Sequence, residues 1–143
     1  MLPLGLVDED EEVTEDADRD YWLKRAGPAT LAMADAFFEK FIRPCDAGLS
    51  MKYNRGYIGT IKKNGGAAFN FVCLSPKKST LSIWVKLPQT DETDERIRTA
   101  NLDQIGYSKP YQQYRIRLTK EDLDKNTEVL AHLSKAAFEA RTA

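Results

Sequence analysis

Residues 80–87 alternate between apolar and polar side chains, and this alternation limits the folds open to the chain more than any other feature. Side chains of a β-strand point alternately to its two faces, so one face of this strand would be apolar. The apolar positions are Leu81, Ile83, Val85 and Leu87, and the opposite face would carry Ser82, Trp84 and Lys86. An apolar face needs a second layer to cover it, which predicts a sheet packed against helices.

Further strands are predicted before this run. Residues 57–61 and 67–74 are rich in β-forming residues and flank Asn64-Gly65-Gly66, a strong hairpin signal. The sequence SPKKS at 75–79 supplies the next turn. Strands joined by such short turns run antiparallel. We therefore expect an antiparallel meander, with residues 49–54 as an additional short strand.

A last strand and a last helix are predicted near the C-terminus. Residues 113–118 alternate again, with arginines on the face that would be wet. Thr119 and Asp122 have the spacing of a capping pair. Apolar residues then recur three and four positions apart as far as Phe138, which predicts one C-terminal helix.

Three more helices complete the expected fold. Residues 28–42 carry one apolar stripe at helical spacing, and shorter helices are expected at 18–26 and 93–102. The fold class is therefore α+β within the broad α/β class. We expect a small antiparallel sheet of four to five strands, with N-terminal and C-terminal helices packed mainly on one face.

The charges are divided unevenly along the chain. Residues 8–20 hold nine acids and one base, whereas residues 21–143 hold 20 bases and 13 acids, a net charge of +7. An acidic segment with few apolar residues cannot offset its ordering entropy by burial. We expect residues 1–17 to form an acidic, disordered tail and 18–143 a single globular domain. The tail is either a solubilising leader, which is the simpler interpretation, or a segment that folds over the basic body and competes with an anionic ligand.

The sequence contains no pattern typical of catalysis or cofactor binding. The single histidine, His132, lies in the expected C-terminal helix, and the two cysteines have no zinc-motif spacing. Cys73 alternates with Phe69 and Phe71, which predicts that it packs with them in the core. We expect no catalytic residue, metal or cofactor. Few cysteines and no apolar run of about 18 residues favour a cytoplasmic protein without membrane association.

Basic residues supply the candidate binding site. If helices cover one face of the sheet, Trp84, Lys86, Arg115 and Arg117 would meet on the open face. An aromatic ring among cations can stack on bases while the cations neutralise phosphates. Lysines at the turns would add phosphate contacts: Lys62, Lys63, Lys77 and Lys78. The alternative is an ordinary solvated face, with the N-terminal helix covering Trp84.

Five segments of the chain add a family resemblance. They are YI at 57–58, FNF at 69–71, SPKK at 75–78, LSIWVKL at 81–87 and YRIRLTKED at 114–122. Together they resemble a bacterial domain family of unknown function whose members are often labelled predicted transport proteins. The resemblance covers about residues 20–141 and implies a small α/β accessory domain, sometimes fused to restriction-endonuclease-like modules. It implies no catalytic residue, and it suggests an accessory to a separately encoded enzyme.

Three functional hypotheses follow, in decreasing order of support. The first is a non-enzymatic accessory module that binds DNA or RNA through the basic sheet face with little sequence preference. The second is a protein–protein interaction or dimerisation module that uses an exposed aromatic patch or an unpaired strand edge. The third is an enzyme with an unrecognised site, which a pocket with convergent polar groups would support.

Overall fold

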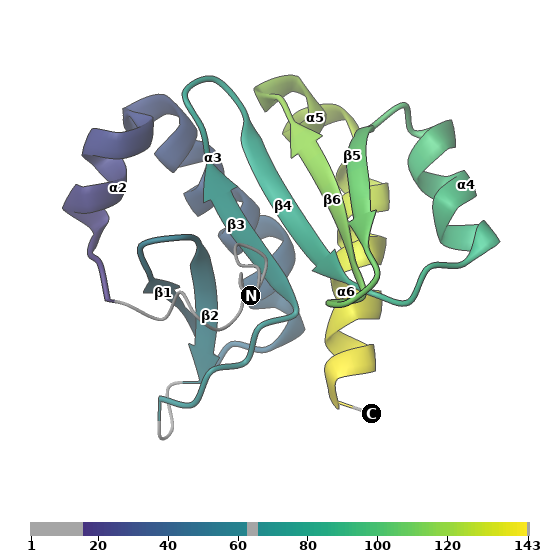
Figure 1. Cartoon of the computed structure of the whole chain (residues 1–143), viewed down its shortest axis with the longest axis horizontal. Coiled ribbons are helices and arrows are strands. Elements are labelled where there is room, and N and C mark those ends of the chain that lie inside the picture. The colour runs from purple at the N-terminus through teal and green to yellow at the C-terminus, as the bar shows by residue number, and fades with distance from the viewer. Residues whose placement is uncertain (1–15, 63–65, 143) are drawn as a thin grey trace.

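A six-stranded antiparallel sheet forms the centre of the molecule (Figure 1). The computed structural model describes residues 16–62 and 66–142. The strand order is β1-β2-β3-β4-β6-β5, and every neighbouring pair is antiparallel. The strands are β1 Leu49–Tyr53, β2 Ile58–Lys62, β3 Val72–Pro76, β4 Leu81–Lys86, β5 Asp103–Ser108 and β6 Gln113–Leu118. The α+β class is confirmed, whereas the sheet has six strands rather than the four to five expected.

The strand that the sequence did not predict is β5, which lies at the edge of the sheet beside β6. Its sequence, DQIGYS, lacks apolar alternation, and its first three residues are exposed. A register shift between Gln104 and Gly106 interrupts its pairing with β6. An edge strand that buries little surface needs no apolar face, so it leaves little pattern in the sequence.

Strand β3 begins later than the expected run 67–74, because the side chain of Asn70 replaces a strand partner. Asn70 Oδ1 accepts a hydrogen bond from the backbone N–H of Thr60 on β2 at 2.9 Å. A Cβ atom at Gly59 would lie 2.4 Å from the same oxygen, so any larger residue there would displace the Asn70 side chain. The chain bends at Phe71 before the regular pairing of β3 begins.

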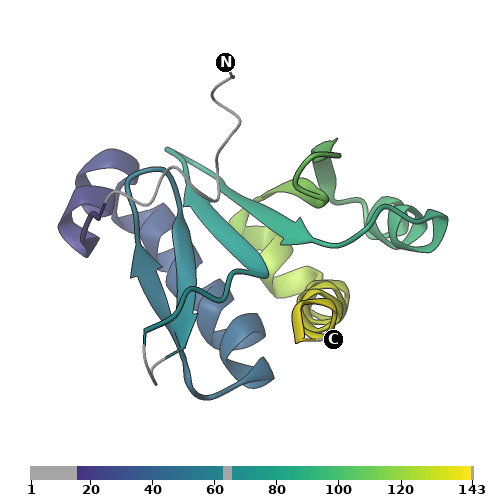
Figure 2. The ribbon, with the colours of Figure 1, turned by 60° about the horizontal axis from the view of Figure 1, so that its bottom comes forward.

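The helices lie mainly on one side of the sheet. They are α2 Arg19–Ala26, α3 Pro28–Phe37 with its continuations η1 Phe38–Ile42 and η2 Arg43–Cys45, α4 Asp91–Thr99, α5 Lys120–Lys125 and α6 Thr127–Thr142. Helices α3 and α6 contact β3 and β4, and α5 contacts β6. Figure 2 shows this layer on one side of the sheet, with α4 beyond the β5 edge. Within the described ranges, no helix has the length and apolar content that a membrane crossing requires.

The expected C-terminal helix is divided in two. The capping box predicted from Thr119 and Asp122 is confirmed and starts α5. Asn126 then leaves the helical conformation, with φ −107° and ψ 34°, and its side-chain amide donates to Asp122 Oδ1 at 3.2 Å. The apolar stripe continues across this break, since Leu123, Leu130 and Leu133 are all buried.

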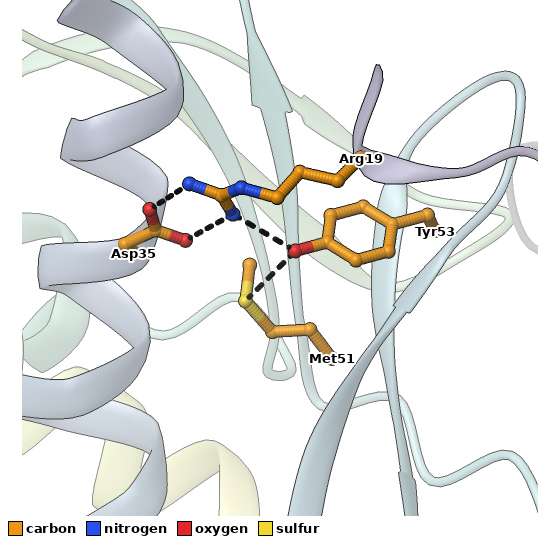
Figure 3. Close-up of polar contacts among 4 residues, drawn as sticks. All are labelled: Arg19, Asp35, Met51 and Tyr53. Atoms are coloured by element: carbon orange, nitrogen blue, oxygen red, sulfur yellow. Dashed lines mark hydrogen bonds and ion pairs between the residues drawn. The ribbon is translucent and has the colours of Figure 1, made fainter. Parts of the chain in front are cut away.

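Trp22 and Arg19 are among the side chains that attach helix α2 to the body. Trp22 is fully buried, and its indole Nε1–H donates to the carbonyl oxygen of Asn54 at 2.8 Å. The Arg19 guanidinium donates to both carboxylate oxygens of Asp35 on α3, at 2.9 and 2.6 Å, and to the hydroxyl of Tyr53 on β1 at 3.0 Å (Figure 3). The Tyr53 hydroxyl donates in turn to Met51 Sδ. These contacts fix α2 relative to α3 and β1.

The folded body includes two residues that the sequence assigns to the tail. The backbone N–H of Ala17 donates to Tyr53 O at 3.1 Å, and Asp16 forms a β-bridge with Asn54. The carboxylate of Asp16 also accepts a hydrogen bond from Lys52 Nζ at 2.6 Å. The rest of the expected tail, residues 1–15, lies outside the described residues.

Candidate nucleic-acid interface

Strands β4 and β6 bring four of the predicted site residues onto one face of the sheet. Trp84 lies directly opposite Arg115 in the register. Lys86 lies two residues after Trp84 on β4, and Arg117 lies two residues after Arg115 on β6. Both therefore belong to the same face. The intervening residues point to the face that α3, α5 and α6 cover. The alternation in the sequence therefore placed these four residues correctly relative to one another.

Trp84 is half-buried, and its neighbour is an aromatic ring that the sequence did not indicate. The rings of Trp84 and Tyr57 pack with their centroids 5.9 Å apart and their planes tilted by 49°. Tyr57 is buried and supports one side of the indole. Figures 1 and 2 place α2 at the β1 side of the sheet, away from β4. The indole is thus held in a fixed position while part of it reaches solvent.

The cations of this face differ in their surroundings. Lys86 Nζ donates to Gln113 Oε1 across the strand pair at 3.2 Å. Arg117 is exposed, and its Nε–H donates to Asp103 on β5 at 3.0 Å. Exposed ion pairs of this kind stabilise by about 0–1 kcal/mol, so a phosphate oxygen could replace the Asp103 carboxylate at little cost. Arg115 is half-buried between Trp84 and β5.

Cys73 lies on this face and not on the face that the sequence predicts. Its register partner is Trp84, whereas Leu74 pairs with Ile83 on the helix-covered side. Phe69 and Phe71 instead pack against Phe138 of α6. The prediction that Cys73 shares a face with these phenylalanines is wrong, because the bend at Phe71 interrupts the alternation. Cys73 is nevertheless fully buried, as expected.

The turn lysines are divided between two ends of the sheet. Lys62 lies at the end of β2, where its Nζ is 4.3 Å from the centroid of Phe69, and Arg141 of α6 approaches the same ring. Lys77 and Lys78 lie beyond the opposite end of β3, a strand about 17 Å long at roughly 3.3 Å per residue. Lys63 lies outside the described residues, together with most of the expected Asn64-Gly65-Gly66 turn. The described turn lysines therefore lie at well-separated positions.

Three features of the described residues bear on catalysis. No group of three or more metal-ligating side chains occurs among them. His132 is exposed on α6, and burial raises the pKa of the Cys45 thiol, which disfavours the reactive thiolate. A groove of about 490 Å³ lies between α4 and the α5–α6 junction. Its basic residues Arg96 and Lys125 each pair with a glutamate of their own helix.

Comparison with known proteins does not assign the chain to a family. No family model, no curated protein and no solved structure matches it. The resemblance to the accessory-domain family, drawn from the segments between residues 57 and 122, stays a prediction.

Proposed function

We propose that this chain is a non-enzymatic accessory module that binds DNA or RNA through the face formed by β4 and β6. The observation that carries this proposal is the placement of Trp84 directly opposite Arg115 on the face that the helices leave uncovered. An aromatic ring can stack on any base, and such stacking contributes about 1–3 kcal/mol per base. The cations beside it can neutralise the phosphates that flank the stacked base.

The charge of the body supports the same proposal. Residues 21–143 carry a net charge of +7, and Lys62, Lys77 and Lys78 extend the basic surface beyond both ends of the strands. Contacts to phosphates give affinity without reading the base sequence. If four cations each neutralise one phosphate of a single strand, the slope of log K against log salt concentration is about −3. Binding should therefore weaken roughly 50-fold between 50 and 200 mM salt.

The first test is a fluorescence-polarisation titration with single- and double-stranded DNA and RNA at these two salt concentrations. The intact chain is compared with a chain that begins at Asp16, since this cut keeps the hydrogen bond between Ala17 and Tyr53. Tighter binding by the shortened chain would show that the acidic residues before Asp16 compete with the nucleic acid. Equal binding would favour the interpretation that these residues are a solubilising leader. Affinity that does not change with salt would refute the proposal.

Two variants and a control locate the surface. Trp84→Leu keeps apolar packing on Tyr57 but removes the stacking ring, and Arg115→Gln removes one charge. We expect each to weaken binding about 10-fold. Lys135→Gln makes the same charge change on an exposed position of α6 and should change affinity less than about twofold. Equal losses in all three variants would place the binding surface elsewhere.

A protein-interaction or dimerisation module is the second candidate, and the β5 edge favours it. Ile105 is 45% exposed on this edge strand, where a second copy or a separately encoded enzyme could add a strand. Analytical ultracentrifugation over a wide concentration range tests self-association. If the edge mediates self-association, Ile105→Lys should give a monomer at every concentration.

We also propose a cytoplasmic location. Cys45 and Cys73 are not joined by a disulfide, which is consistent with this location.

A further inference from the structure

A small pocket lies at the end of β4, between the last turns of α6 and the connection from β5 to β6 (Figure 1). Its volume is about 230 Å³. Lys86 lines it together with the residues that follow β4, Tyr111 and Gln112 line it from the β5–β6 connection, and Arg141 lines it from α6. The pocket therefore brings together three segments that are distant in the sequence.

The charged residues among the described lining of this pocket are basic. They are Lys86 and Arg141, and no carboxylate accompanies them there. The groove beside α4 differs, because three glutamates line it together with its two basic residues. A cavity lined by charges of one sign raises the local concentration of ligands with the opposite charge. The pocket at the end of β4 therefore favours an anion.

Arg141 lies against an aromatic ring that it shares with a third cation. Its guanidinium carbon is 4.8 Å from the centroid of Phe69, and Lys62 Nζ is 4.3 Å from the same centroid. Cation–π contacts at exposed positions contribute about 0.5–1 kcal/mol, and they leave the positive charge in place. Among the ion pairs between described residues, none includes Arg141 or Lys62. The ring therefore positions both cations without neutralising them.

The ordinary preference for cations at the end of a helix explains only part of this arrangement. The negative end of the α6 dipole attracts Arg141, the basic residue of its last turn. It does not account for Lys86, which reaches the same pocket from a strand. Nor does it explain why the described lining lacks a carboxylate to balance the two charges.

The rest of the lining limits the size of the ligand. Leu87 and Ala137 are buried, and the half-buried Tyr111 lines the pocket with them. The backbone N–H of Gln112 donates to the carbonyl oxygen of Lys109 at 3.3 Å, which closes the turn that carries Tyr111. Sites for drug-sized ligands combine apolar walls with a few polar groups and have volumes of about 300–1,000 Å³. At about 230 Å³ this pocket suits a smaller group, such as a sugar phosphate.

We propose that this pocket binds the sugar phosphate of a single nucleotide, with Lys86 and Arg141 as the cations that contact the phosphate. A guanidinium binds phosphate oxygens with paired N–H donors, and an ammonium group binds them as a point charge. The ligand is a free nucleoside monophosphate or the phosphorylated end of a strand. Lys86 also belongs to the β4–β6 face, so a strand that crosses this face would reach the pocket at the end of β4. The choice of a nucleotide rests on the proposed function, whereas the preference for an anion rests on the pocket itself.

The site is tested by titrating the isotopically labelled full chain with adenosine 5′-monophosphate at constant ionic strength, followed by NMR. Adenosine, which lacks the phosphate, is the matched control ligand. We expect saturable shifts of the amide signals of residues 86–87, 111–112 and 137–141. Adenosine should bind at least tenfold more weakly, because the two cations would have no phosphate to contact.

Two variants separate the charge of the pocket from its shape. Arg141→Gln removes one cation, and Ala140→Phe fills the pocket without changing its charge. Each should weaken the binding of adenosine 5′-monophosphate at least fivefold. Lys135→Gln removes one charge from an exposed position of α6 outside the lining and should change affinity less than twofold. The Trp22 indole N–H signal reports the bond to Asn54 and should persist in every variant.

Three results would overturn the site: adenosine that binds as tightly as its monophosphate, equal weakening by Lys135→Gln and Arg141→Gln, or no shifts at the residues that line the pocket. The source of the phosphate is resolved with a 5′-phosphorylated oligonucleotide and its unphosphorylated counterpart. A preference for the phosphorylated strand that Arg141→Gln abolishes identifies a strand end as ligand. A response to adenosine 5′-monophosphate without this preference identifies the free nucleotide.

The same variants distinguish failure of this site from failure of the sheet-face proposal. Trp84→Leu should leave the response to adenosine 5′-monophosphate intact, because Trp84 does not line the pocket. Arg141→Gln should change the affinity for the unphosphorylated oligonucleotide less than twofold, because Arg141 lies on α6 and not on the β4–β6 face.

Discussion

The two faces of the sheet are built from the same strands but differ in chemistry. On β6, Tyr114, Ile116 and Leu118 are fully buried against the helix layer, whereas Arg115 is half-buried and Arg117 is exposed. Buried apolar surface stabilises by about 25 cal/mol per Å², while an exposed ion pair gives at most about 1 kcal/mol. On β6, folding therefore depends mainly on the apolar side chains of the helix-covered face, and Arg115 and Arg117 can serve binding at little cost to stability. Substitutions along β6 test this difference directly.

The largest effect is expected from Ile116→Ala. Ile116 is fully buried and lies opposite Ile83 of β4 in the middle of the helix-covered face. Removing its side chain leaves a cavity, and the free energy of unfolding should fall by about 3–4 kcal/mol. Urea denaturation followed by circular dichroism measures this change. A loss below about 1 kcal/mol would show that this face contributes less than its burial indicates.

A smaller effect is expected from Tyr114→Phe, which keeps the ring and removes the hydroxyl. This hydroxyl donates to Asp94 Oδ1 at 2.8 Å and accepts from the backbone N–H of Thr90 at 3.2 Å, at the start of α4. Its loss should lower the free energy of unfolding by about 1–2 kcal/mol.

The same variant should change the dependence of stability on alkaline pH. Burial, and then the hydrogen bond to Asp94, raise the pKa of Tyr114 from 10.0 to about 12. Between these two values the unfolded chain loses the proton while the folded chain keeps it, so the free energy of unfolding falls as the pH rises. Urea denaturation at pH 8 and pH 11 should show a smaller fall for Tyr114→Phe than for the natural chain. Equal falls would show that Tyr114 does not contribute.

The smallest effect on stability is expected from Arg117→Gln, one residue from Ile116 but on the opposite face. The substitution removes an exposed ion pair with Asp103, so the free energy of unfolding should change by less than about 1 kcal/mol. High salt should reduce the difference further. If Arg117→Gln destabilised the chain as much as Ile116→Ala, the two faces would not differ as described.

Local periodicity predicted the parts of the fold that depend on burial. The alternation in 80–87 and 113–118 indicated correctly which residues face the helices, and therefore which residues share a face with Trp84. The capping spacing of Thr119 and Asp122 located the start of α5. Such patterns repeat over a few residues, so one sequence suffices to recognise them.

The remaining features depend on contacts between distant residues. Strand β5 has no apolar alternation, and the side chain of Asn70, which accepts a hydrogen bond from Thr60, interrupts the backbone pairing of β2 with the segment that leads into β3. The contact between Trp84 and Tyr57 joins β4 to the connection between β1 and β2, and the Trp22 indole reaches Asn54 only after α2 packs against the body. No local spacing in the sequence predicts these contacts. The candidate face was therefore predictable from the sequence, and these long-range contacts were not.

The strand order has a consequence for the path of folding. Strands β1 to β4 form one meander of local contacts, and β5 and β6 form a separate hairpin. The pairing between β4 and β6 joins these two units. It requires the closure of a long loop, so we expect this pairing to form late. Trp84 belongs to the first unit and Arg115 to the second. The surface proposed to bind nucleic acid would thus exist only after β4 has paired with β6, and a partly folded chain would lack it.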